Sequence, residues 1–238
     1  MIHQLLAGFM PGDAISNYAL HLQKLFRDWG YSSDIFVFPR HVDERVRHLC
    51  RPPSEHKGLS SPHNILIYHF SIGSIATDYF RSVPDIKIVI YHNITPRQFF
   101  AVVLPETAAF LRQGCEQLRQ LAPIAELALG VSEYNRRELE TAGFHRTGVI
   151  PLIINWSSLK EKPSHRISRK FHRSEENILF VGRIVPNKRI EDLLKVFFYF
   201  KNFLKSQGRL LLVGFHKGSE NYLRYLQSIA QELSLRDV

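Results

Sequence analysis

Short apolar runs separated by glycine- and proline-bearing turns alternate with helical patterns over the first 154 residues. Apolar runs of about four to eight residues are typical of buried strands and too short for helices. We expect strands at 2–7, 34–38, 64–69, 85–92, 125–131 and 148–152.

Helical spacing fills the gaps between these strands. Asp13 is the expected N-cap of the first helix and Gly30 its stop, with an apolar stripe of Ile15, Ala19, Leu22, Phe26 and Trp29. A second helix is expected at 105–121, with Phe110, Leu111, Leu118 and Leu121 as core contacts. A third is expected between a Ser132 cap and Gly143. Strands that alternate with helices predict an α/β fold with a parallel sheet and right-handed crossovers.

The pattern restarts at Asn177. Strands are expected at 177–181 and 209–213, and helices at 189–204 and 220–235, the first with Ile190, Leu193, Leu194, Phe197 and Leu204 on its apolar face. The intervening segment is polar, basic and without apolar periodicity. We therefore predict two Rossmann-like domains, at 1–154 and 177–238, joined by a basic linker at 155–176.

A glycine turn follows the strand at 177–181 and carries two cations. Gly182 breaks the strand, Pro186 suits a turn or first helical position, and Arg183 and Lys188 flank it. Ligands of open α/β sheets bind at the carboxyl ends of strands, and a helix N-terminus there favours an anion. Either a diphosphate site or two solvated surface charges fits this stretch, because neither G-x-x-x-x-G-K-[ST] nor G-x-G-x-x-G is present.

Two strands of the first domain finish in Tyr-His, at His69 and His92, and Thr95 follows the second. In a parallel sheet both histidines would emerge on the same edge as the Gly12-Asp13 turn. Gly12 either lets a ligand approach the backbone or simply makes the turn. A lone histidine at a strand end is more often structural, but two at equivalent ends favour an active cleft, since histidine acts near neutral pH.

Composition narrows the class of protein. A hydrophobic content of 45% with 22% charged residues is ordinary for a soluble globular protein. Two cysteines, Cys50 and Cys115, form neither a disulfide scaffold nor a four-cysteine zinc site, so a reducing cytoplasm is the expected location. We recognise no signal peptide and no apolar run of about 18 residues that would span a membrane.

The net charge of +9 is concentrated in one place. Between Lys160 and Arg173 there are six Lys or Arg and one acid, Glu161, which gives +5. This segment is either a solvated linker or a peripheral contact for an anionic membrane surface or nucleic acid. No helix-turn-helix, zinc-finger or RRM signature accompanies it, so we expect no specific nucleic-acid partner.

The order of these pieces resembles the GT-B-fold retaining glycosyltransferases of the family 4 type. The closest similarity runs through 178–183, Asn187-Lys188, 190–194 and 210–214. The Gly12-Asp13 turn resembles the family's first loop, and 91–95 the strand end that bears its active-site histidine. Residues 132–135 with Gly143-Phe144 resemble the last helix of its N-terminal domain.

This resemblance implies a hexosyltransferase of the EC 2.4 class that transfers sugar from a nucleoside-diphosphate sugar to a hydroxyl acceptor in a glycan, lipid or polysaccharide precursor. It implies His92 as the catalytic residue, and Arg183, Lys188 and Gly182 as the donor-diphosphate site. Gly12, Asp13, His69 and Thr95 would line the cleft. No metal or other cofactor is expected, and the location would be cytoplasmic or peripheral at the inner face of a membrane.

The resemblance also implies more strands and a pair of glutamates seven residues apart, which would lie beyond Val238. We therefore expect the second domain to be truncated, with an exposed sheet edge. The alternative function is a non-catalytic, truncated or split subunit that binds nucleotide or a partner chain. A basic nucleic-acid-binding protein that uses residues 160–173 is a third hypothesis.

Overall fold

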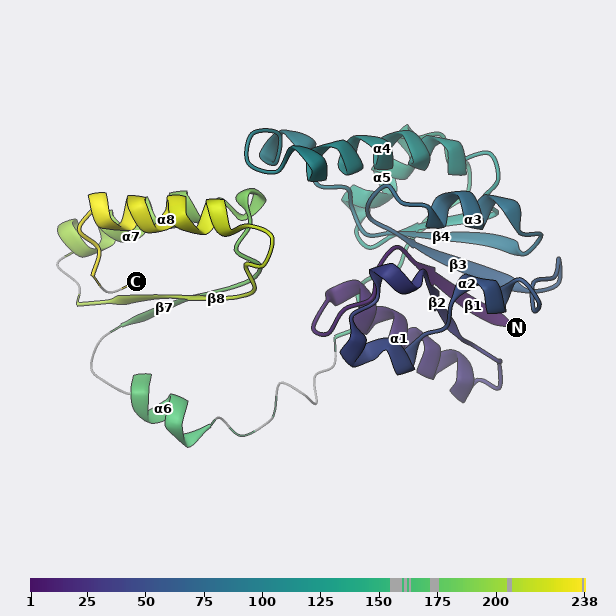
Figure 1. Ribbon diagram of the computed structural model, residues 1–238, viewed down its shortest axis with the longest axis horizontal. Helices are drawn as coiled ribbons and strands as arrows, with labels where there is room; N and C mark the ends of the chain where they lie inside the picture. The colour runs from purple at the N-terminus through teal and green to yellow at the C-terminus, as the bar shows by residue number, and fades with distance from the viewer. Residues whose placement is uncertain (155–159, 161, 163, 172–175, 205–206, 237) are drawn as a thin grey trace. The chain divides into compact units, whose positions relative to one another are not determined.

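The computed structural model in Figure 1 describes residues 1–154, 160, 162, 164–171, 176–204, 207–236 and 238. The chain divides into two compact units, one of residues 1–96 with 109–154 and one of residues 97–108 with 155–238. The predicted domain limits at 154 and 177 stay predictions. Much of the predicted linker, namely 155–159, 161, 163 and 172–175, lies outside the described residues.

A six-stranded parallel sheet forms the first unit, in the order β2-β1-β3-β4-β5-β6. The strands are β1 Ile2–Leu6, β2 Ile35–Val37, β3 Ile65–Phe70, β4 Ile86–Tyr91, β5 Leu127–Gly130 and β6 Thr147–Val149. The predicted α/β class and all six predicted strands of this part of the chain are confirmed. The strand that was expected to end at His69 continues to Phe70.

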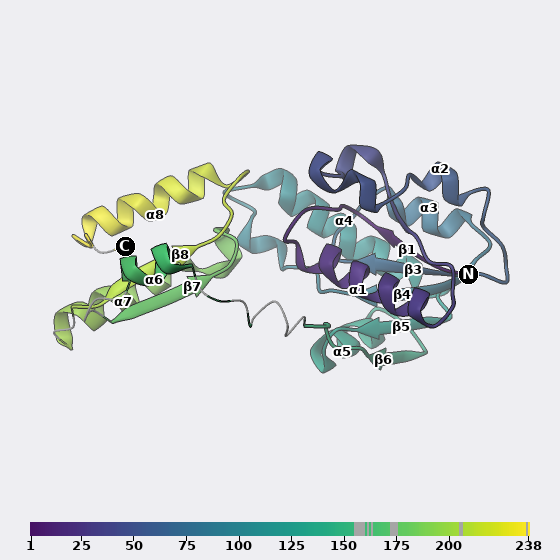
Figure 2. The same ribbon diagram turned by 90° about the horizontal axis from the view of Figure 1, so that it is seen from below.

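Helices cover both faces of this sheet. They are α1 Ala14–Asp28, α2 Pro53–His56, α3 Ala76–Ser82, α4 Pro105–Leu121 and α5 Glu133–Thr141, with 3-10 turns η1 Pro39–His41 and η2 Glu44–Leu49. The 3-10 turn η3 Arg97–Phe99 and the first turn of α4, to Ala108, group with the second unit. Helix α1 lies against one face, and α3 and α4 lie on the opposite one (Figure 1). In Figure 2 α1 runs across the central strands, where Tyr18, Leu22 and Phe26 pack against Ile67 and Ile90.

The predicted helix ends of this unit are confirmed by their hydrogen bonds and backbone angles. The Asp13 carboxylate accepts a hydrogen bond from the backbone N–H of Ser16, and the Ser132 hydroxyl accepts one from Asn135 N–H. Gly30 and Gly143 follow the C-caps with φ of 85° and 101°, the left-handed conformation that favours glycine at this position.

In the second unit, β7 Asn177–Val181 and β8 Arg209–Val213 form a parallel pair with the predicted bounds. Helices α7 Ile190–Phe203 and α8 Glu220–Glu232 lie on one face of this pair (Figure 1). The buried core between them consists of Ile184, Ile190, Leu194, Phe197, Leu210, Tyr222 and Leu226. Before β7 in the same unit, α6 His165–Phe171 is helical, although no helix was predicted there.

Three residues predicted on apolar helix faces are exposed. Phe110 is 52% exposed although it lies only about 20° around α4 from Leu121, which is fully buried with Leu111 and Leu118. Trp29 and Leu204 are 62% and 71% exposed, since each is the C-cap residue beyond the last helical turn of α1 or α7. Periodicity places a residue on a face but does not show where the helix ends.

Candidate functional site

The predicted cleft residues of the first unit lie around the point where the strand order reverses. Strand β1 has β2 on one side and β3 on the other, and in open α/β sheets ligands bind at the carboxyl ends beside such a reversal. Gly12 and Asp13 follow β1, His69 lies near the carboxyl end of β3, and His92 comes directly after β4. Three neighbouring parallel strands therefore bring these residues to one edge.

The two histidines are in direct contact. His69 Nδ1 lies 2.9 Å from His92 Nε2, and the two imidazole rings stack with centroids 5.2 Å apart. On the other side of His69, Nε2 lies 2.9 Å from Gln4 Oε1. The Gln4 amide in turn donates to the Ala19 carbonyl of α1 at 3.0 Å. A continuous chain of hydrogen bonds thus runs from helix α1 through β1 and β3 to His92.

Burial sets the protonation of both rings. His69 is 1% exposed, and its burial, with a smaller effect of neighbouring His92, holds its pKa well below 6.5. Burial also lowers the pKa of the partly exposed His92 to about 4, against an opposing effect of Asp13. Both imidazoles are therefore neutral at pH 7. A neutral His92 can accept a proton or a hydrogen bond, which is what a general base requires.

Sequence reasoning missed Gln4 and Tyr18, which support this pair. The Tyr18 ring packs edge-on against His69 and His92, at centroid distances of 5.8 and 5.6 Å. The available signal was a polar residue inside an apolar strand: Gln4 is completely buried in Ile-His-Gln-Leu-Leu. A buried polar side chain needs partners, and here those partners are a helix carbonyl and His69.

The remaining cleft candidates lie in the loops beside the pair. Asp13 is exposed, but its Oδ2 is already engaged by Ser16 N–H and Oγ–H, at 2.9 and 2.8 Å, so it acts first as a helix cap. Gly12 has φ of 73°, and a Cβ built there meets no atom within 4 Å, so the turn accounts for the glycine and leaves open space beside it. Half-buried Thr95 lies three residues after His92 in the same loop.

In the second unit, the turn after β7 presents two exposed cations. Arg183 and Lys188 have no ion-pair partner among the described residues, whereas neighbouring Arg189 is bound to Asp192 at 2.6 Å. The turn is a short 3-10 segment, η5 Pro186–Lys188, and α7 begins only at Ile190. The N–H of Ile190 donates to the Tyr222 hydroxyl at 3.0 Å. Anion binding at this turn would therefore depend on the two side chains more than on that backbone group.

Backbone contacts hold this turn in place. Gly182 N–H donates to Val213 O and Ile184 N–H to Phe215 O, at 3.0 and 2.9 Å, which continues the β7–β8 pairing into both following loops. A Cβ at Gly214 would lie 1.7 Å from the Gly182 carbonyl oxygen. Only glycine permits this approach, so Gly214 shapes the turn that carries Arg183.

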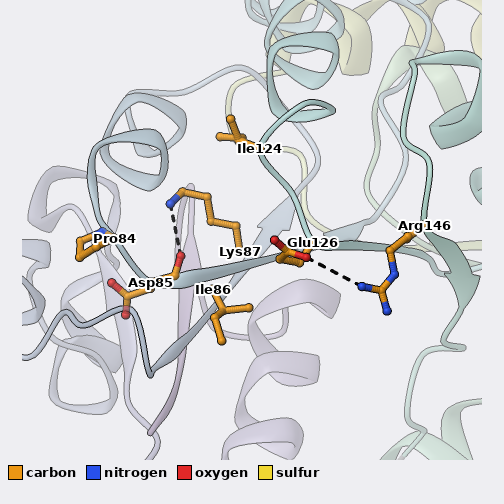
Figure 3. Close-up of a pocket in the computed structure, with 7 residues that line it drawn as sticks. All are labelled: Pro84, Asp85, Ile86, Lys87, Ile124, Glu126 and Arg146. Atoms are coloured by element: carbon orange, nitrogen blue, oxygen red, sulfur yellow. Dashed lines mark hydrogen bonds and ion pairs between the residues drawn. The ribbon is translucent and has the colours of Figure 1, made fainter.

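A separate pocket lies at the opposite edge of the six-stranded sheet, at the amino ends of β4, β5 and β6 (Figure 3). Its charged groups are already engaged. The Lys87 amine donates to the carbonyls of Val83 and Asp85, at 2.5 and 3.3 Å, and Arg146 pairs with Glu126 at 3.8 Å. The pocket shares no residue with the histidine edge.

Comparisons with known proteins bear on the fold. No protein-family model matches the chain, and no curated protein matches it in sequence. Solved structures do match. Sucrose-phosphate synthase from Thermosynechococcus elongatus has a TM-score of 0.69 at 16% identity, over 100% of this chain and 69% of that one. A glycosyltransferase from Rickettsia africae has a TM-score of 0.67 at 11% identity, over 99% and 66%.

An alpha-glucosyltransferase in complex with UDP also matches, with a TM-score of 0.62 at 10% identity, over 96% of this chain and 61% of that one. The chain thus spans 61% to 69% of the length of these three structures. At such low identity the likeness shows the fold, which is the Rossmann-like α/β fold of GT-B glycosyltransferases. Among the described residues, no helix is long and apolar enough to cross a lipid bilayer.

Proposed function

We propose that the chain is a glycosyltransferase, or the greater part of one, that transfers a hexose from a nucleoside-diphosphate sugar to a hydroxyl acceptor. The observation that carries the proposal is the pair of exposed cations at the carboxyl end of β7, Arg183 and Lys188, for which the described part of the chain offers no ion-pair partner. The likeness in fold to glycosyltransferases, one of them in complex with UDP, supports this assignment.

The two cations would bind the diphosphate. In sugar transfer, negative charge develops on the leaving diphosphate, and fixed cations that neutralise it lower the barrier. An arginine offers two parallel hydrogen bonds to phosphate oxygens, and a lysine adds a compact point charge. Two such groups reduce the need for a metal ion, so we propose that donor binding is metal-independent. Addition of a chelator should then leave nucleotide binding unchanged.

His92 would act on a hydroxyl group. It is neutral at pH 7 and partly exposed, as a residue that accepts a hydrogen bond from a sugar or acceptor hydroxyl must be. His69, Gly12, Asp13 and Thr95 would line the same edge. Retention of anomeric configuration, the family 4 affiliation and a role in polysaccharide or glycolipid synthesis in the cytoplasm belong to the proposal as well.

Calorimetric titration with UDP and other nucleoside diphosphates tests the donor site. Loss of a charge-assisted hydrogen bond costs about 1.5–3 kcal/mol, so Arg183→Ala and Lys188→Ala should each weaken binding by about tenfold to a hundredfold. The matched control is Lys195→Ala, which removes the same charge from an exposed α7 side chain paired with Asp192 at 3.7 Å. No binding by the wild type, or equal affinities for all variants, would refute the proposal.

Turnover is tested separately, by release of UDP from UDP-sugars in the presence of hydroxyl acceptors. A wild-type chain that turns over while His92→Ala does not would support a transferase. Binding without turnover under all acceptors would point instead to a nucleotide-binding subunit that works with another chain. Co-sedimentation with anionic vesicles tests whether the basic segment at 160–173 contacts a membrane surface.

A further inference from the structure

The hydrogen-bond chain behind His92 has a direction that can be worked out from its buried end. The Ala19 carbonyl oxygen can only accept a hydrogen bond, and it lies 3.0 Å from the Gln4 amide. The Gln4 atom that faces it must therefore be the NH₂ group. This orients the other end of the amide, Oε1, toward His69 at 2.9 Å.

Each further link follows from the previous one. Gln4 Oε1 is an acceptor, so His69 Nε2 must carry a proton and donate it. A neutral imidazole carries only one N–H, and burial keeps His69 neutral, so its Nδ1 has a bare lone pair. The contact of 2.9 Å between His69 Nδ1 and His92 Nε2 needs one proton between them. His92 Nε2 must supply it.

The opposite tautomer of His69, with the proton on Nδ1, is unfavourable because the ring is buried. If His69 carried its proton on Nδ1, its Nε2 lone pair would face the Gln4 oxygen at 2.9 Å, with no proton between two acceptors. Rotation of the Gln4 amide would only move the same conflict to the Ala19 carbonyl. Gln4 is 0% exposed and His69 1%, so water cannot relieve either conflict.

We propose that Gln4 and His69 are positioning residues that hold His92 in its Nε2–H tautomer, so that Nδ1 is the free lone pair available to a substrate hydroxyl. Among the described residues, no group hydrogen-bonds to His92 Nδ1. Edge-on packing of Tyr18 against both rings supports their orientation. The role of the substrate hydroxyl rests on the proposed function, but the tautomer itself does not.

Nitrogen NMR of the ¹⁵N-labelled full chain tests the tautomer without any substrate. At pH 7 we expect the proton between the two rings to be bonded to His92 Nε2 and to show a coupling through the hydrogen bond to His69 Nδ1. We expect His92 Nδ1 to be unprotonated. A proton bonded to His69 Nδ1, or two rings with no coupling, would overturn the proposal. Because this measurement needs no activity, its failure is distinguishable from failure of the proposed transferase function.

Two substitutions of Gln4 test whether this residue determines the tautomer of His92. Gln4→Leu removes the oxygen that fixes His69, so a second population with His92 Nδ1 protonated should appear in the spectrum. In its protonated form the Gln4→Glu side chain donates its O–H to the Ala19 carbonyl and presents its other oxygen to His69, so the wild-type tautomer should persist while that carboxyl is neutral. Equal spectra for Gln4→Leu and the wild type would contradict the positioning role. If Gln4→Leu does not fold, the wild-type spectrum still decides.

Activity provides the second readout. A general base contributes about a hundredfold or more to the rate, so in Gln4→Leu kcat should fall by up to about a hundredfold while KM for the sugar donor stays the same. Gln4→Glu should retain most of the wild-type kcat at a pH where the introduced carboxyl is protonated. A purely structural role of Gln4 would instead lower the amount of folded protein without changing the kcat of the folded fraction.

Discussion

Acidification should destabilise the first unit through His92. Burial lowers the pKa of His92 in the folded protein from its ordinary value of 6.5 to about 4, whereas the unfolded chain retains the ordinary value. Between these two pH values the unfolded state binds more protons than the folded state. Stability therefore rises with pH in this window and is lost as the pH falls through it.

The size of the effect follows from the two pKa values. Between pH 7 and pH 4.5, a group that titrates at 6.5 when unfolded and at about 4 when folded removes about 2.5 kcal/mol from the free energy of unfolding. This is a large fraction of the about 5–15 kcal/mol that stabilises a typical domain. His69 acts in the same direction, because burial also lowers its pKa.

Urea denaturation followed by circular dichroism at several pH values between 7 and 4.5 measures this loss. The informative variant is His92→Gln, in which the side-chain amide can still donate to His69 Nδ1 but cannot titrate. Its stability should fall by about 2.5 kcal/mol less than that of the wild type over the same range. The control is His63→Gln, since His63 is exposed. Parallel pH profiles for His92→Gln and the wild type would refute the reasoning.

Three further substitutions test contacts that position the candidate site. In Gly130→Ala the new Cβ would lie 2.4 Å from the backbone nitrogen of Arg136, so unfolding in urea should show a loss of at least about 1–3 kcal/mol. In Gly214→Ala the Cβ would overlap the Gly182 carbonyl at 1.7 Å, so calorimetry should show weakened UDP binding as the turn after β7 shifts. Ser132→Ala removes the N-cap of α5 and should cost about 1 kcal/mol in urea unfolding.

Matched controls separate these effects from general damage. Gly58→Ala places a Cβ 3.8 Å from the nearest atom and should leave both stability and UDP binding unchanged. Ser132→Asp keeps a side-chain acceptor at the N-cap and should restore the lost stability. If Gly130→Ala or Gly214→Ala behaves like Gly58→Ala, the backbone at that position has room for a Cβ, and the reasoning from close contact is wrong.

Helices and strands whose two ends are both marked in the sequence were predicted with nearly the observed bounds. The bounds of α4 are those expected, and β7 and β8 match to the residue, because each strand is an apolar run delimited by polar residues and a following glycine. The caps at Asp13 and Ser132 were also predicted, since capping joins groups only three residues apart. The edge shared by His69 and His92 followed from the parallel sheet.

Contacts between residues far apart in sequence were not predictable in the same way. Gln4 and His69 are 65 residues apart, and their hydrogen bond forms because β1 pairs with β3 as well as with β2. Phe110 is exposed although it lies about 20° from buried Leu121 around α4, so helical periodicity could not distinguish the two. Helix α6 was not predicted because its 7 residues form no apolar stripe.

The amino-acid sequence by itself determined where strands, helices and caps form, and it placed histidines and the Arg183–Lys188 pair at the carboxyl ends of strands. These features depend on residues within one or two turns of each other, where periodicity and backbone preferences act. Only the tertiary structure decided that His69 and His92 touch, that Gln4 stands behind them, and hence which nitrogen of His92 is free. A proton's position depends on every partner in a buried network, and that network is assembled by the fold.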